Sequence, residues 1–110
     1  MLSMTMTFAE DENLNKVENV NAYRMEVNYS KLGEALNLSS DQMEAVQCIH
    51  DAFCADMISV ATANKESRKA MMKNAIDREV RFMHIVLNEK QYRKFLLLLN
   101  VTLNNRGLNG

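Results

Sequence analysis

The sequence predicts an all-α protein of about four helices, and three observations lead to this fold class. The 110 residues include no proline and only three glycines, so few residues suit the tight turns of β-hairpins. Hydrophobic residues make up 47% of the chain and recur at helical spacing. Two five-residue segments have the pattern of helix N-termini. We assign residues 19–107 to a single helical domain, a hairpin or bundle with a modest core.

The first helix is predicted from about Val20 to Leu36. Its apolar residues form two stripes, which predicts contact with two neighbouring elements. One stripe is Met25, Tyr29, Leu32 and Leu36, and the other is Val20, Tyr23 and Val27. Asn37 is a suitable terminator, because asparagine tolerates the left-handed conformation that ends many helices.

The second helix begins in the segment Leu38-Ser39-Ser40-Asp41-Gln42. The Ser39 side chain can accept a backbone N–H of the first turn, and Gln42 stands where a capping box has its reciprocal partner. Leu38 precedes the cap, as a hydrophobic staple requires. An amphipathic pattern then continues from Ser40 to about Thr62.

Neither glycine nor proline marks the boundary between the second and third helices. Asn64 can cap a helix and Glu66 suits a first turn, so we expect a bend near residues 63–64. The third helix then runs to about Leu87. One continuous helix from Ser40 to Leu87 is the alternative.

The last helix begins in a second segment of the same kind, Leu87-Asn88-Glu89-Lys90-Gln91. Asn88 is the predicted cap and Gln91 its capping-box partner. The helix is expected to run from Glu89 to about Asn105, with Gly107 just beyond its end.

This last helix is apolar on two sides. A main stripe covers one side, while Leu97 and Val101 lie on nearly the opposite side. In so small a domain, the second apolar side predicts contact with another chain. We therefore expect a homodimer, with Leu97, Leu98 and Val101 as the candidate interface.

The formal charge of −1 is unevenly distributed. Residues 10–56 hold ten acidic and three basic residues, whereas residues 65–110 hold four acidic and ten basic ones. We expect the acidic half to pack beside the basic half; a basic surface for an anionic partner is the alternative. Nucleic acid is not the expected partner, because acids are interspersed among the basic residues and no recognition motif accompanies them.

The first nine residues are apolar and uncharged, and Thr7-Phe8-Ala9 resembles a signal-peptidase site. We interpret residues 1–9 as the remnant of an export signal peptide and residues 10–18 as a flexible lead-in. The expected location is the periplasm or the cell exterior, and a cytoplasmic N-terminal segment is the alternative. No stretch approaches the ~18 apolar residues of a membrane-spanning helix.

The sequence brings together too few ligands for a metal site. His50 and Cys54 share a helix face, but zinc sites use three or four ligands. Cys54 is expected to be a small buried side chain, and Cys48 to lie on the far side of the same helix. No metal or other cofactor is therefore predicted.

The chain has no phosphate-binding glycine loop, nucleophile elbow or His-Glu-x-x-His segment. The acidic residues are expected on the solvent-facing sides of helices. The sequence therefore predicts a binding protein and not an enzyme.

The two capping segments, Leu38 to Gln42 and Leu87 to Gln91, form an internal repeat with an offset of 49 residues. They resemble the paired Leu-Thr-x-x-Gln motif of small periplasmic proteins related to Spy and CpxP. Ser39 replaces the motif's threonine conservatively, and Asn88 departs further but can still cap. The resemblance covers roughly residues 36–106. It implies an all-helical fold, an intertwined antiparallel dimer, and a role as an ATP-independent chaperone or modulator in envelope stress.

These observations predict an exported, non-enzymatic helical protein. We expect it to shield apolar segments of unfolded or envelope proteins with a mixed apolar and basic surface. Two alternatives stay open: a structural or regulatory module with one specific protein partner, and a metal-responsive binder.

Overall fold

The computed structural model describes residues 20–108, and within this range the protein is all-helical, as predicted. A short 3-10 turn, η1 (Val20–Tyr23), precedes four α-helices. These are α2 (Tyr29–Leu36), α3 (Ser40–Thr62), α4 (Lys65–Val86) and α5 (Glu89–Asn105). The predicted signal remnant at residues 1–9 and lead-in at residues 10–18 lie outside the described residues.

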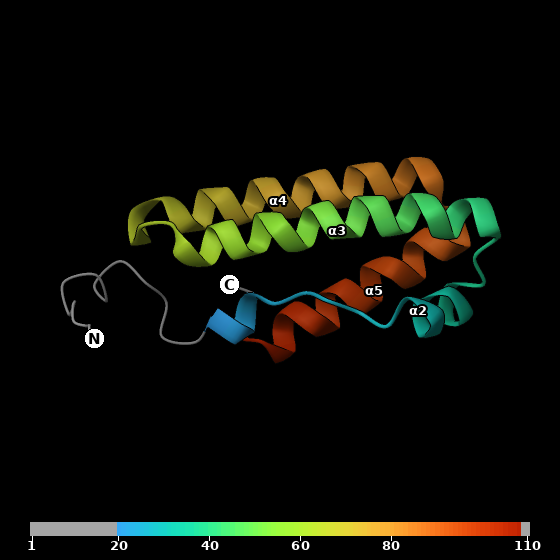
Figure 1. Ribbon diagram of the computed structural model, residues 1–110, viewed down its shortest axis with the longest axis horizontal. Helices are drawn as coiled ribbons and strands as arrows, with labels where there is room; N and C mark the ends of the chain where they lie inside the picture. The colour runs from blue at the N-terminus through green and yellow to red at the C-terminus, as the bar shows by residue number, and fades with distance from the viewer. Residues whose placement is uncertain (1–19, 109–110) are drawn as a thin grey trace, which may run out of the picture.

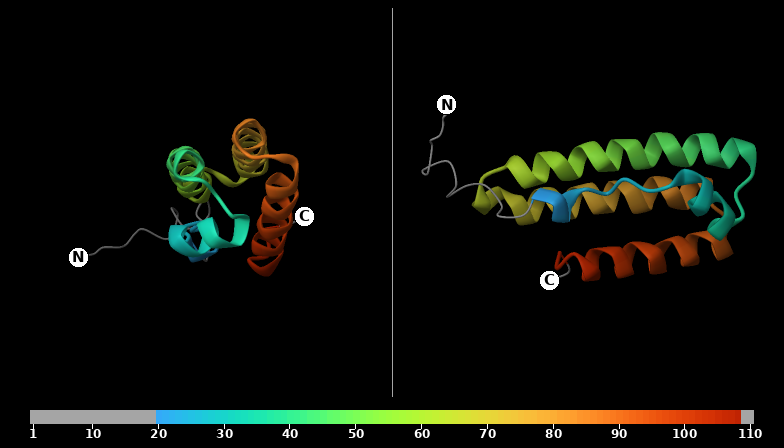
Figure 2. Two further views of the ribbon diagram at one scale, coloured as in Figure 1. Left: turned by 90° about the vertical axis from the view of Figure 1, so that its right-hand side faces the viewer. Right: turned by 60° about the horizontal axis from the view of Figure 1, so that its bottom comes forward.

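The two longest helices, α3 and α4, form an antiparallel hairpin, and α5 folds back along one side of it (Figure 1). The short α2 and the extended segment before it lie on the same side of the hairpin as α5 (Figure 2). The resulting molecule is elongated, with extents of 48 × 26 × 20 Å.

The core between these helices consists of two apolar clusters. The cluster nearer the α3–α4 turn is formed by Met25, Phe53, Met57, Val60, Ala75 and Leu103. The cluster nearer the α4–α5 turn is formed by Leu36, Val46, Met83, Leu87 and Phe95, with Leu38 partly buried against it. Each cluster draws side chains from at least three elements, so the helices depend on one another for burial of their apolar stripes.

The break between α3 and α4 falls at the predicted residues. Ala63 ends α3 in an extended conformation, and the Asn64 side chain accepts the Ser67 N–H at 3.0 Å. The continuous helix that was the alternative does not form.

At the other end of the chain, α5 ends at Asn105, and Gly107 has a φ of 71°, in the left-handed region that favours glycine.

The prediction of a single helix over residues 20–36 is wrong for its first part. After η1 the backbone is extended as far as Asn28, and only then does α2 begin. The reason is tertiary: the Arg106 guanidinium donates to the Arg24 carbonyl, and the His50 ring donates to the Met25 carbonyl. These two bonds hold the backbone at residues 24 and 25 against α5 and α3, so contacts from distant residues override the local helical pattern.

Asparagines mark both ends of α2. The Asn28 side chain accepts the Lys31 N–H at 3.1 Å and starts the helix. Asn37 ends it with φ of 56° and ψ of 54°, the left-handed conformation expected of this residue.

Candidate functional site

Each predicted capping segment starts a helix in the structure. The Gln42 N–H donates to the Ser39 hydroxyl at 3.1 Å, and the Ser39 N–H donates to Gln42 Oε1 at 3.0 Å. Asn88 and Gln91 make the same two bonds at 2.8 and 3.0 Å. Both helices, α3 and α5, therefore begin with a complete capping box.

The two capping boxes also bond to each other through their glutamines. Gln42 Nε2 donates to Gln91 Oε1 at 2.8 Å, and Gln91 Nε2 donates to Gln42 Oε1 at 3.1 Å. The remaining N–H of Gln42 donates to the Val86 carbonyl, and that of Gln91 donates to the Asn37 carbonyl. Asn37 precedes the cap Ser39 by two residues, and Val86 precedes the cap Asn88 by two residues. The two copies of the sequence repeat therefore make equivalent hydrogen bonds, related by a local two-fold symmetry. This glutamine pair is fully hydrogen-bonded and serves structure, not chemistry.

The polar group buried most deeply among the helices is a histidine–glutamate pair between α3 and α4. His50 is 6% exposed and Glu79 is 2% exposed. His50 Nε2 lies 2.6 Å from the Met25 carbonyl oxygen, and His50 Nδ1 lies 3.2 Å from Glu79 Oε2. Because a carbonyl can only accept, His50 Nε2 carries a hydrogen and donates it.

The bond between Nδ1 and Oε2 then contains a single shared proton. With Nε2 protonated, either neutral Glu79 donates to Nδ1, or protonated His50 donates to the carboxylate. In both forms the pair has no net charge. Burial raises the pKa of Glu79, against the lowering effect of its bond to His50. Burial lowers the pKa of His50, but the bond to Glu79, its charge and the Met25 carbonyl outweigh burial and raise it. The pair therefore retains its proton more strongly than the separate groups would.

Aromatic rings pack against this histidine. The Tyr29 ring meets His50 edge-on with centroids 6.1 Å apart, and the Phe53 ring lies 5.6 Å away. The Tyr29 hydroxyl donates to Asp51 at 2.7 Å. Burial, followed by the bond to this carboxylate, raises the pKa of Tyr29, so its hydroxyl stays a donor.

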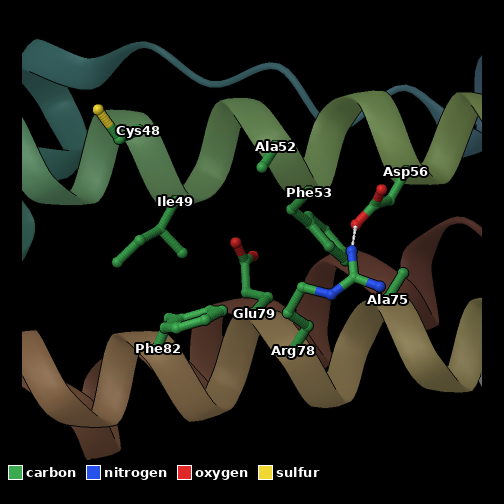
Figure 3. Close-up of a pocket in the computed structure, with 9 residues that line it drawn as sticks. All are labelled: Cys48, Ile49, Ala52, Phe53, Asp56, Ala75, Arg78, Glu79 and Phe82. Atoms are coloured by element: carbon green, nitrogen blue, oxygen red, sulfur yellow. Dashed lines mark hydrogen bonds and ion pairs between the residues drawn. The ribbon is translucent and has the colours of Figure 1, made fainter.

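The second carboxylate oxygen, Glu79 Oε1, is buried and has no hydrogen-bond partner among residues 20–108. It belongs to a side chain that lines a cavity of about 260 Å³ between α3 and α4, which we call the α3/α4 groove (Figure 3). The groove is lined mainly by apolar atoms, from Cys48, Ile49, Ala52, Phe53, Asp56, Ala75, Arg78, Glu79 and Phe82. A buried acceptor in an apolar cavity is a feature of ligand sites.

The outer rim of the α3/α4 groove combines apolar and basic side chains. Phe82 is 43% exposed and Ile85, one turn further along α4, is 74% exposed. The Arg81 guanidinium lies 5.6 Å from the centre of the Phe82 ring, a cation–π arrangement. Arg78 pairs with Asp56 across the groove, so the basic and acidic halves of the chain meet here. The rim can therefore contact an apolar partner and attract an acidic one.

The two cysteines lie in different environments. Cys48 is exposed, and Cys54 is half-buried, with a pKa that burial and the charge of Glu26 raise to about 11. Both ring nitrogens of His50 are engaged in hydrogen bonds, which leaves neither for a metal. Within residues 20–108, no group of three His, Cys, Asp or Glu side chains is placed to hold an ion.

The candidate interface residues do not share one environment. Leu97 is 62% exposed and Val101 is 49% exposed, on the side of α5 that faces away from the core. Leu98 is half-buried and packs against the second apolar cluster. The outer side of α5 therefore presents Leu97 and Val101, whereas Leu98 belongs largely to the interior.

Glu79 is the residue that the sequence interpretation missed, because acids were expected on solvent-facing sides. That expectation is wrong here. Glu79 follows Ala75 by four residues and precedes Met83 by four, and both neighbours are buried. A lone acid inside an apolar helical stripe was the available signal of burial.

The fold and site together define a small all-helical protein with a buried histidine–glutamate pair beneath an open apolar groove. Comparison of the sequence with protein-family models, with curated proteins and with solved structures finds no match. In the described part of the chain, no helix has both the length and the apolar character that crossing a bilayer demands.

Proposed function

We propose that the protein is an exported, non-enzymatic binding protein that acts on apolar segments of other proteins in the manner of a chaperone. The observation that carries this proposal is the α3/α4 groove, an apolar cavity open to solvent, with Phe82 exposed in its lining and Ile85 exposed one turn further along α4. Exposed apolar surface next to a cavity is typical of protein-binding sites.

The mechanism follows from the composition of the rim. Burial of a client's apolar side chains against Phe82 and Ile85 supplies the attraction at short range. Arg81 adds a positive charge that favours clients with acidic flanks, whereas the charge of Arg78 is paired with Asp56. Neither step needs ATP, in line with the absence of a phosphate-binding loop from the sequence.

The glutamine pair supports the similarity to Spy- and CpxP-related periplasmic proteins. In this chain, the two motif copies bond to one another, so each copy has a structural reason to retain its glutamine. On the basis of that similarity, we propose that the protein works in the periplasm or outside the cell, as an envelope-stress chaperone or modulator.

The outer side of α5 supports a further part of the proposal, a homodimer. Leu97 and Val101 are apolar, exposed and one turn apart, and together they form a stripe that a second copy can cover. A dimer formed through α5 leaves the α3/α4 groove of each chain open to a client, because the groove lies on the other side of α4.

The test is suppression of aggregation of a thermally unfolded model client. The unmodified protein is expected to lower light scattering at equimolar concentration, and Ile85→Glu to reduce this effect, since a charge then occupies the rim. Val20→Glu is the matched control: it places the same charge at an exposed valine on η1 and is expected to retain activity. Undiminished aggregation with a molar excess of the unmodified protein would rule out the chaperone function.

A further inference from the structure

The starting point is Glu79 Oε1, a buried oxygen that has no hydrogen-bond partner in the part of the chain that the structure describes. Glu79 is 2% exposed as a residue and its side chain is 0% exposed, and its other oxygen is already bonded to His50. Figure 3 shows the carboxylate in the space between Ile49, Phe53 and Phe82, pointing from α4 toward α3. A buried acceptor without a partner lowers stability, so a bound group that donates a hydrogen bond to it gains both that bond and the removal of this penalty.

The charge of the pair selects the donor. His50 and Glu79 together carry no net charge, whichever of them holds the shared proton. A cationic ligand would therefore leave an uncompensated positive charge in an apolar cavity, which is costly. A neutral O–H or N–H group adds a hydrogen bond without adding charge.

The side chains that line the groove determine which apolar group can carry this hydrogen-bond donor. Ile49, Phe53 and Phe82 offer apolar and aromatic surface, and the cavity of about 260 Å³ suits a single ring. The Glu79 side chain is fully buried, so a ligand reaches its oxygen only when a wall of the groove moves, and the inference assigns that movement to Phe82, which is 43% exposed. Because the groove is open along one side, the ring can stay attached to a longer chain that runs over the rim.

The geometry points to a phenolic ring as the occupant: the side chain of a tyrosine in a bound client segment, with its hydroxyl donating to Glu79 Oε1. This inference rests on the α3/α4 groove being the client site, and it adds the group that the groove selects. Phenylalanine fills the same space but has no donor. Serine has a donor but no ring, and lysine or arginine adds a charge.

The first experiment uses phenol and toluene, which differ by a hydroxyl in place of a methyl group, in amide NMR titrations of the full chain. Phenol is expected to bind about tenfold more tightly than toluene, from one hydrogen bond to a charged or strongly polar acceptor. Resonances of α3 and α4 around the groove are expected to shift. Equal affinities in the unmodified protein would overturn the inference.

Glu79→Gln tests the acceptor without removing the partner of His50. The glutamine amide can donate to Nδ1, while its oxygen faces the groove as a neutral and weaker acceptor. The preference for phenol is expected to fall to about threefold. Phe82→Ala is expected to weaken both ligands equally, and Leu97→Ala, on the outer side of α5, to change neither. An unchanged phenol preference in Glu79→Gln would overturn the assignment of Glu79.

The second experiment uses two apolar peptides that differ only in tyrosine or phenylalanine at one position. The tyrosine peptide is expected to bind more tightly, and this difference to shrink in Glu79→Gln. Peptides of equal affinity, alongside a clear preference for phenol, would overturn the tyrosine assignment in favour of a free phenolic molecule. If the protein fails to suppress aggregation but still prefers phenol and the tyrosine peptide, the chaperone function alone is rejected. If it suppresses aggregation but shows neither preference, this inference alone is rejected.

Discussion

Gln42 and Gln91 hold each other by two reciprocal amide hydrogen bonds, and they join helix starts that lie 49 residues apart. Each oxygen also accepts a backbone N–H of its own capping box. The pair therefore couples the local start of α3 to that of α5, and it fixes the end of the molecule at which α2, α3, α4 and α5 converge.

Replacement of either glutamine by alanine is expected to destabilise the protein by about 1–3 kcal/mol, because it leaves the other amide partly unpaired. The double variant should lose less than the sum of the two, since no orphaned amide then remains. Urea denaturation of Gln42→Ala, Gln91→Ala and the double variant measures this coupling. Gln47→Ala, at an exposed position of α3, is the control and should be near neutral. Strict additivity would show that the pair does not couple the two helices.

The left-handed Asn37 gives a prediction about backbone conformation. Asn37→Ala is expected to cost about 1 kcal/mol, because a β-carbon is unfavourable at a φ of 56°. Asn37→Gly should be nearly as stable as the unmodified protein, since glycine adopts this conformation freely. Both variants keep the backbone carbonyl that accepts from Gln91. Equal stabilities of the alanine and glycine variants in chemical denaturation would contradict this reasoning.

The His50–Glu79 pair predicts how stability depends on pH. The pKa of His50 is raised from 6.5 in the folded protein: burial opposes this shift, but the bond to Glu79 and its charge outweigh it. As the pH rises above 6.5, His50 loses its proton in the unfolded state but keeps it in the folded state. The folded state then binds more protons, so the free energy of unfolding is expected to fall as pH rises. Glu79, whose pKa burial raises, shares this one proton with His50, so the two groups contribute a single slope. The melting temperature, followed from about pH 5 to 9, measures this slope.

Glu79→Gln should reverse the slope near neutral pH. Without a carboxylate partner, burial lowers the pKa of His50 in the folded variant. The variant is then expected to lose stability as the pH falls below 6.5, the ordinary pKa of histidine. Asp51, whose charge also raises the pKa of His50, is present in both proteins, and Cys54, with a pKa that burial raises to about 11, stays protonated across the measured range. Parallel pH profiles for the two proteins would mean that the pair does not share a proton as described.

The exposed stripe on α5 predicts the effect of charge on assembly. Light scattering coupled to size-exclusion chromatography is expected to give a mass twice that of one chain. Leu97→Glu combined with Val101→Glu should yield monomers, because two charges then replace the apolar stripe. Ile85→Glu, at a still more exposed apolar position on α4, is the control and should leave the dimer intact. A monomeric unmodified protein at high micromolar concentration would remove the dimer from the proposal.

Helix boundaries from Asn37 onward were predictable because the signals are local. Ser39, Asn64 and Asn88 cap through atoms within three residues of themselves, so their effect is visible in the sequence. The start of the chain was not predictable in the same way. The carbonyl of Met25 is bonded to His50, and that of Arg24 to Arg106, and no local pattern reveals partners 25 and 82 residues away.

The sequence by itself determined the fold class, the four-helix order and the two capping boxes, since propensity, spacing and capping act within a few residues. Only the tertiary structure decided that residues 24–28 are extended and that the two capping glutamines meet. It also decided that Glu79 is buried beside His50, with one oxygen that has no partner among residues 20–108. These features depend on which helix faces come together, and packing of distant segments settles that choice. The α3/α4 groove is of this second kind, because its walls and its acceptor come from helices that meet only in the folded protein.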